Sequence, residues 1–182
     1  IQRPATPERL GTPTRCTWTE AVAGVELDVK ALPEGDYEIR TTVRIGEQSL
    51  DLLPTGWSRI RDAKVRIEQL RQPRVQPETD ESAWIRATIQ DQFRILNSML
   101  EGEAQEVDYP AHHWLVMNEQ LLARPETAAT LIRDTAQSRD VWLTVAQGRK
   151  KVPLRLRVPA NIDPAAPLGV LMLFHGAGGS EN

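Results

Sequence analysis

The spacing of apolar residues changes twice along this chain of 182 residues, and each change marks a change of secondary structure. Apolar and polar residues alternate between Val25 and Ile45, which predicts half-buried antiparallel strands. Between residues 57 and 137 the apolar residues recur every three or four positions, which predicts helices. The alternation returns between Val141 and Val158. We therefore expect an α+β chain in which a helical region separates two β-rich ends.

The composition excludes several classes of protein. A hydrophobic content of 40% is enough for a core, and the net charge of −3 arises from 22 basic and 25 acidic residues mixed along the chain. No basic surface for nucleic acid is therefore expected. No apolar run approaches the roughly 20 residues that span a bilayer, and no signal peptide is visible. The single cysteine, Cys16, excludes an internal disulfide and is expected to be a small buried strand residue.

The first β-rich part is predicted at residues 16–53, after a proline-rich linker at residues 1–15. Its segment Leu32-Pro-Glu-Gly-Asp-Tyr37 resembles the tyrosine corner of immunoglobulin-like sandwiches, where a Tyr hydroxyl bonds back to the backbone. The resemblance implies a β-sandwich-like piece. Only three or four strands are visible where a sandwich has about seven, so the module is expected to start before Ile1. A small β-meander is the alternative.

The helical region is predicted at residues 54–139. Its four expected helices cover about 57–71, about 80–101 with a cap at Thr79, Asp80 or Ser82 and an end at Gly102, 111–123, and 126–137. Trp84 and Trp114 occupy apolar helical positions and are expected in the core. His112 and His113 are adjacent, so they point about 100° apart on a helix and do not suit one metal ion. Both are expected at the surface or partly buried.

The last part, residues 140–182, begins with an expected hairpin at 140–158 that turns at Gln147-Gly-Arg149. The apolar run from Val170 to Phe174 predicts a buried parallel strand, which ends in His175-Gly-Ala-Gly-Gly179. A phosphate-binding loop and a simple tight turn are the alternatives for this glycine-rich segment. The spacing fails the dinucleotide-binding pattern, and no Lys follows as in a P-loop.

This order of strand, His-Gly and small-residue loop resembles the segment after the third strand of α/β-hydrolases. Residues 140–182 resemble the beginning of the catalytic domains of esterases, polyhydroxyalkanoate-depolymerase-like enzymes and prolyl-oligopeptidase-like peptidases. The resemblance implies that the backbone N–H of Ala177, with Gly176 as the neighbouring candidate, forms half of an oxyanion hole. It implies that His175 orients the loop and is not the catalytic base.

The nucleophile of this family lies in a Gly-x-Ser-x-Gly turn that follows the loop, and no such sequence occurs in the 182 residues. Ser180 has no visible base around it, so it is a poor candidate for that role. The chain thus contains neither a nucleophile nor a base. We expect it to be the N-terminal portion of a serine hydrolase, cut after its first catalytic element and inactive alone.

The expected reaction of the whole protein is hydrolysis of a carboxylic ester through an acyl-enzyme, without a cofactor or metal. A prolyl-oligopeptidase-like peptidase, with a peptide as its substrate, is one alternative. A non-enzymatic binding or scaffold module is the other. The region before residue 140 is expected to shape access to the active site or to hold a polymer or protein partner. A sandwich joined to a hydrolase favours a secreted or periplasmic location over a cytoplasmic one.

Overall fold

The expected succession of strands, helices and strands is present in the computed structural model, which describes residues 29–73, 80–104, 109–124, 139–147, 150–160, 163, 167 and 169–173. The chain is α+β, and the strands of each described sheet are antiparallel. The elements are β1 (Gly35–Ile39), β2 (Thr42–Ile45), β3 (Gln48–Asp51), β4 (Thr55–Arg59), α1 (Ala63–Gln69), α2 (Asp80–Glu101), α3 (Ala111–Ala123), β5 (Arg139–Gln147) and β6 (Lys150–Val158).

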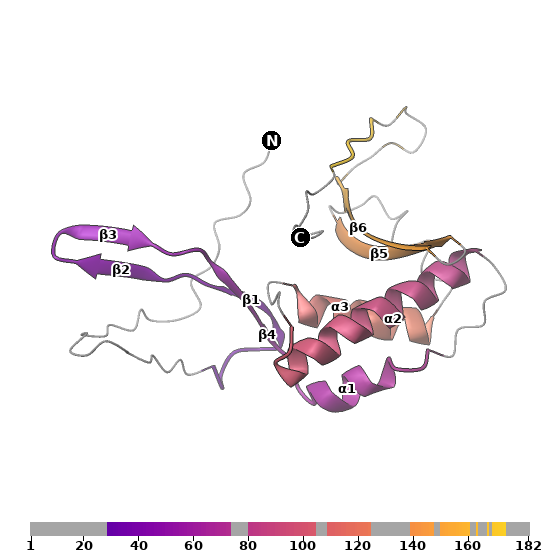
Figure 1. Ribbon diagram of the computed structural model, residues 1–182, viewed down its shortest axis with the longest axis horizontal. Coiled ribbons are helices and arrows are strands. Elements are labelled where there is room, and N and C mark those ends of the chain that lie inside the picture. Colours follow the sequence, from indigo (N-terminus) through magenta and orange to yellow (C-terminus); the bar gives the residue numbers. More distant parts are fainter. Residues whose placement is uncertain are drawn as a thin grey trace.

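The first four strands form one long ribbon made of two nested antiparallel pairs, in which β1 pairs with β4 and β2 pairs with β3. Figure 1 shows β2 and β3 extending away from the helices. The turn at the tip uses Gly46, whose φ of 61° suits the first central position of a two-residue hairpin loop. Val43, Ile45 and Leu50 share one face of this ribbon by their cross-strand register, and Ile45 is 76% exposed.

The tyrosine-corner hydrogen bond is present. The Tyr37 hydroxyl donates to the Pro33 carbonyl oxygen at 2.7 Å, four residues earlier in the chain. The described strands of this part nevertheless form separate two-stranded sheets and not two packed layers, so the local motif occurs here without a described sandwich. The expected strand around Val25 to Leu27, and Cys16, lie outside the described residues.

The prediction of a helix from residue 57 is wrong for its first part. Trp57 lies in β4 directly opposite Tyr37, and the two rings pack with centroids 5.5 Å apart. Such cross-strand aromatic pairs stabilise a ribbon, although the three-residue spacing of Trp57 and Ile60 taken alone matches a helix. The helix begins only at Ala63, after Asp62 adopts a left-handed conformation with a φ of 50°.

The long helix α2 ends as its sequence predicts. Gly102 has a φ of 73°, its N–H donates to the Met99 carbonyl, and the Glu103 N–H donates to the Ser98 carbonyl at 2.8 Å. These two bonds define the Schellman motif that closes many helices at a glycine. The prediction that Trp84 lies in the core is wrong. Trp84 is 36% exposed, while its neighbour Ile85 is only 5% exposed. The buried stripe runs through Ile85, and Trp84 lies about 100° away from it.

The hydrophobic core is built by the three helices and β5. Figure 1 shows α1, α2 and α3 side by side with the β5–β6 hairpin beside them. Trp114, only 1% exposed, is the largest fully buried side chain, as expected for its position in α3. The buried apolar cluster consists of Ile67, Leu70, Ile85, Ile89, Leu96, Tyr109, Ala111, Trp114, Leu115, Met117, Leu121, Val141 and Trp142.

The N-terminus of α3 is capped by side chains from the β1–β4 sheet. Pro110, which precedes the helix, supplies no side-chain cap. The Asp36 carboxylate instead accepts the N–H groups of His112 and His113, each at 2.9 Å, and the Ser58 hydroxyl accepts the N–H of Ala111 at 3.2 Å. The same hydroxyl donates to Asp36 at 2.6 Å. Two otherwise unpaired helical donors, the N–H groups of His112 and His113, are thereby satisfied by a residue more than 70 positions earlier in the chain, and the Ala111 N–H is shared between Ser58 and the Tyr109 carbonyl.

An arginine joins α1 to the same unit. The Arg66 guanidinium binds both carboxylate oxygens of Glu119 in α3, at 2.7 and 2.8 Å, and reaches Glu34 at 3.1 Å. The hydrogen bond to Glu119 raises the pKa of Arg66. The backbone N–H of Arg61 donates to Glu34, and this bond, helped by the charge of Arg66, lowers the pKa of that carboxyl. The geometry is the bidentate one that suits guanidinium to carboxylate.

Loss of the Asp36 cap is expected to destabilise the whole fold. Replacing Asp36 with Ala should lower the free energy of unfolding by about 1–2 kcal/mol, because three hydrogen bonds to one carboxylate are lost. Asp36→Asn keeps one acceptor oxygen and should lose less. Chemical denaturation followed by circular dichroism measures both changes.

The matched control is Asp51→Ala. Asp51 is an exposed strand residue whose carboxylate accepts only the Thr42 hydroxyl among the described residues, at 2.7 Å. Its replacement should change the free energy of unfolding by less than about 0.5 kcal/mol. Equal losses for Asp36→Ala and Asp51→Ala would contradict the role of Asp36 as the cap of α3.

Candidate functional site

The residues that the sequence assigns to an oxyanion hole, His175, Gly176 and Ala177, lie outside the described residues, as does Ser180. The structure therefore describes the segments that precede this loop in the sequence, and not the loop itself. These segments are the β5–β6 hairpin, followed along the chain by residues 169–173.

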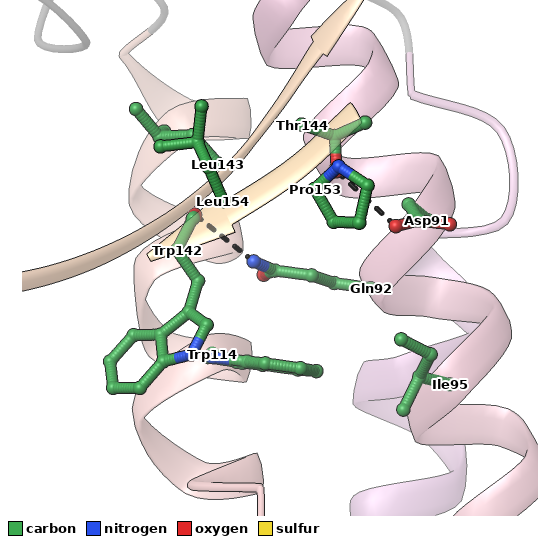
Figure 2. Close-up of a pocket in the computed structure, with 9 residues that line it drawn as sticks. All are labelled: Asp91, Gln92, Ile95, Trp114, Trp142, Leu143, Thr144, Pro153 and Leu154. Carbon is green, nitrogen blue, oxygen red and sulfur yellow. Dashed lines mark hydrogen bonds between the residues drawn. The ribbon is translucent and has the colours of Figure 1, made fainter. Parts of the chain in front are cut away.

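The hairpin is confirmed, with Val141 opposite Leu156, Leu143 opposite Leu154 and Val145 opposite Val152. Because side chains alternate across a strand, these six apolar residues share one face of the hairpin. The other face carries Trp142 and Thr144 toward α2, and Figure 2 shows Leu143 and Leu154 pointing away from Gln92. The hairpin thus has a second apolar face, on which Val152 is 56% exposed.

The prediction of a buried strand at Val170 to Phe174 is wrong for the part that is described. Residues 169–173 form no strand, and Val170, Leu171, Met172 and Leu173 are between 72% and 86% exposed. A parallel strand is stable only when neighbouring strands and covering helices bury both of its faces. No described strand pairs with this segment, so its apolar side chains remain uncovered.

The most organised polar arrangement lies where α2, α3 and β5 meet (Figure 2). The Asn118 side-chain N–H₂ donates to Gln92 Oε1 at 2.8 Å, and Gln92 Nε2 donates to the Trp142 carbonyl at 3.1 Å. All three residues are buried, and Asn118 is fully inaccessible to solvent. One amide side chain on α2 therefore connects α3 to the backbone of β5.

A second set of bonds joins α2 to β5 one turn away. The Thr144 N–H donates to the Thr88 hydroxyl at 2.9 Å, and the Thr144 hydroxyl reaches Asp91 Oδ2 at 3.2 Å. Together with Gln92, these bonds satisfy the carbonyl of Trp142 and the N–H of Thr144, two groups on the edge of β5 that faces away from β6. Side chains of α2 thus take the place of a neighbouring strand.

Trp142 is surrounded by rings and one cation. Its indole packs edge-on against Trp114, with centroids 6.1 Å apart, and His113 lies 5.6 Å from it in a similar orientation. The Arg155 guanidinium lies over the ring at 4.5 Å from the centroid and also binds Asp140 at 3.0 Å. His113 is exposed and His112 half-buried, as expected. The backbone N–H groups of these two adjacent residues are the donors that bind the Asp36 carboxylate at the start of α3.

A small cavity lies at this junction, with about 10 Å³ open to the centre of a water molecule. A space of this size holds about one water and no organic substrate. Its walls come from α2, α3 and both strands of the hairpin. They consist of Asp91, Gln92, Ile95, Trp114, Trp142, Leu143, Thr144, Pro153 and Leu154.

The described residues therefore show a structural junction and no assembled catalytic centre. Within the described ranges, no three His, Cys, Asp or Glu side chains gather as metal ligands would. Ser58 and Asp36 form a close hydroxyl–carboxylate pair, but both are engaged in capping α3. In the described part of the chain, no helix has the length and apolar character that a membrane crossing requires.

One residue of the sequence indicates this junction, although apolar spacing alone does not reveal it. Gln92 occupies the buried stripe of α2 between Ile89 and Leu96, where an apolar residue is expected. A polar residue in such a stripe indicates a buried hydrogen bond. Its partners could not be read from spacing because Asn118 lies 26 residues away and Trp142 lies 50 residues away.

Comparisons of the chain with known protein families, with curated proteins and with solved structures found no match.

The role of Gln92 predicts a large loss of stability when it is replaced. Gln92→Ala leaves the Asn118 amide and the Trp142 carbonyl without their described partner, and should lower the free energy of unfolding by about 2–3 kcal/mol. Gln90→Ala is the matched control, because Gln90 is exposed on the same helix and should lose less than about 0.5 kcal/mol. Urea denaturation of the two variants tests the prediction, and equal midpoints would contradict it.

Proposed function

We propose that this chain is the N-terminal portion of a serine hydrolase that cleaves carboxylic esters through an acyl-enzyme. The loop His175-Gly-Ala-Gly-Gly179 supplies one half of its oxyanion hole. In the reaction a serine oxygen adds to the ester carbonyl carbon, and the carbonyl oxygen acquires the negative charge. The Ala177 N–H, or that of Gly176, stabilises this oxyanion, while His175 orients the loop. The serine belongs to a segment that these 182 residues do not contain.

The observation that carries the proposal is the exposed apolar run directly before the loop. Four consecutive large apolar residues, Val170 to Leu173, are at least 72% exposed, which is costly unless further structure covers them. A central strand of a hydrolase sheet has this composition. Val152, on the apolar face of the β5–β6 hairpin, is 56% exposed and supports the same conclusion, because it also suits contact with a larger sheet-and-helix domain.

Peptide bonds are the alternative substrate, since the same oxyanion chemistry serves a prolyl-oligopeptidase-like peptidase. A non-enzymatic binding module is the alternative class of function. It is favoured by the projecting β2–β3 ribbon, where Ile45 and Leu50 are 76% and 62% exposed. Reading the coding sequence that follows Asn182 distinguishes the classes. A Gly-x-Ser-x-Gly turn followed by Asp or Glu and then His favours the hydrolase, and their absence favours the binding module.

The 182-residue chain alone should be inactive. Purified chain is expected to give no turnover of p-nitrophenyl esters above the buffer rate and no labelling by a fluorophosphonate probe, because the nucleophile and base are missing. The variant Ser180→Ala is the control for this assay. Labelling or turnover that disappears in Ser180→Ala would contradict the proposal that the nucleophile lies elsewhere.

In the protein that carries the downstream segments, the N–H of Ala177 should control the rate. Ala177→Pro removes this N–H and is expected to lower kcat by about 10²–10³-fold, as the loss of one oxyanion donor does. Ala177→Gly keeps the N–H and should retain kcat within a few fold. Thermal unfolding of both variants shows whether they remain folded. A folded Ala177→Pro variant with unchanged kcat would remove Ala177 from the oxyanion hole.

A further inference from the structure

We infer that one long-lived internal water molecule is bound at the junction of α2, α3 and β5, where it accepts hydrogen bonds from the indole N–H groups of Trp114 and Trp142. This inference is independent of the proposed function, since it concerns the helical region and its contact with the hairpin. It rests on unpaired buried donors, on the direction of the amide chain and on the size of the cavity.

The first observation is a set of buried polar atoms without partners. The Nε1 atoms of Trp114 and Trp142 and the Oδ1 atom of Asn118 are inaccessible to solvent and have no hydrogen-bond partner among the described residues. The three residues are at least 94% buried, with exposed fractions of 1%, 6% and 0%. Buried donors and acceptors are almost always paired, either with protein or with ordered water.

The second observation excludes an internal rearrangement of the amides. The Trp142 carbonyl can only accept, so Gln92 must turn its N–H₂ group toward it. Gln92 Oε1 then faces Asn118, which must in turn present its own N–H₂ group. Rotating either amide by 180° would place two donors or two acceptors against each other. Asn118 Oδ1 is therefore left as an acceptor that needs a donor from outside this chain of bonds.

The third observation is a cavity of matching size. Trp114, Trp142 and Gln92 all line the space of about 10 Å³, which corresponds to about one water molecule. The two indole centroids are 6.1 Å apart and the rings are inclined by 65°, and both rings border this one small space. Figure 2 shows both indoles beside the Gln92 side chain.

Water is the ligand whose hydrogen-bonding capacity fits this set. Its oxygen accepts two hydrogen bonds, which matches the two indole donors, Trp114 Nε1 and Trp142 Nε1. A cation would be repelled by two N–H donors. An organic ligand would exceed the cavity. Two of the buried unpaired atoms, the Nε1 atoms of Trp114 and Trp142, belong to residues that line the cavity, and internal waters make between two and four hydrogen bonds.

The test is the transfer of magnetisation between water and the indole N–H protons in the ¹⁵N-labelled 182-residue chain. Trp114 and Trp142 are expected to show the nuclear Overhauser effect of a long-lived water molecule. Trp84 is the matched control within the same spectrum, because it is 36% exposed on α2 and should contact only rapidly exchanging solvent. Protected indole protons of Trp114 and Trp142 without a water signal would mean a dry cavity and would overturn the inference.

A variant tests whether one water serves both rings. Trp142→Phe keeps an aromatic ring but removes one donor, so the long-lived water signal at the Trp114 indole should be lost or strongly reduced. An unchanged signal at Trp114 in a folded variant would overturn the shared site. If Trp142→Phe does not fold, a crystal structure of the unaltered chain decides the matter. An ordered water within hydrogen-bond distance of both Nε1 atoms supports the inference, and an empty cavity at high resolution contradicts it.

Discussion

The buried side chain of Gln92 is the interaction on which the arrangement of helices and hairpin depends. It accepts from α3 through Asn118 and donates to the backbone of β5 at Trp142. An apolar core holds elements together without fixing how far each slides along its neighbour, whereas two hydrogen bonds at defined positions do fix it. A shift of β5 by one residue would present Val141 or Leu143 to α2 and leave the amide unpaired. The core residues around Gln92 thus give the contact its strength, and the amide gives it its register.

Local patterns in the sequence predicted the elements well where one period was dominant. The bounds of α3, the end of α2 at Gly102 and the β5–β6 hairpin follow from spacing and turn residues. The first helix was predicted too early because the three-residue spacing of Trp57 and Ile60 matches a helix, whereas the pairing of Trp57 with Tyr37 places Trp57 in a strand. The contacts that organise the fold join residues up to 77 positions apart. Spacing carries no information on such partners, so the groups that Asp36 and Gln92 bind could not be anticipated.

The helical region and the segment before the proposed oxyanion loop differ in how well their apolar residues are buried. Apolar residues of all three helices are buried in one cluster with β5. The segment at Val170 to Leu173 does the opposite and exposes four large apolar side chains. The contrast distinguishes a packed part of the chain from one whose apolar side chains have no cover among the described residues. The proposed esterase function concerns the segment at Val170 to Leu173 and the loop that follows it. The proposed water site lies in the helical region and its contact with the hairpin.

The use of α2 side chains by the outer edge of β5 limits how this sheet can grow. With the Trp142 carbonyl and the Thr144 N–H already bound to Gln92 and Thr88, another strand cannot be added on that side. On the opposite edge, Pro153 lies across from Thr144 and has no N–H to offer an incoming strand. The longer stretch of β6 that keeps all its donors and acceptors is Leu154 to Val158, after Pro153. A larger sheet would extend from that stretch, and the two features together restrict edge-to-edge pairing of the hairpin.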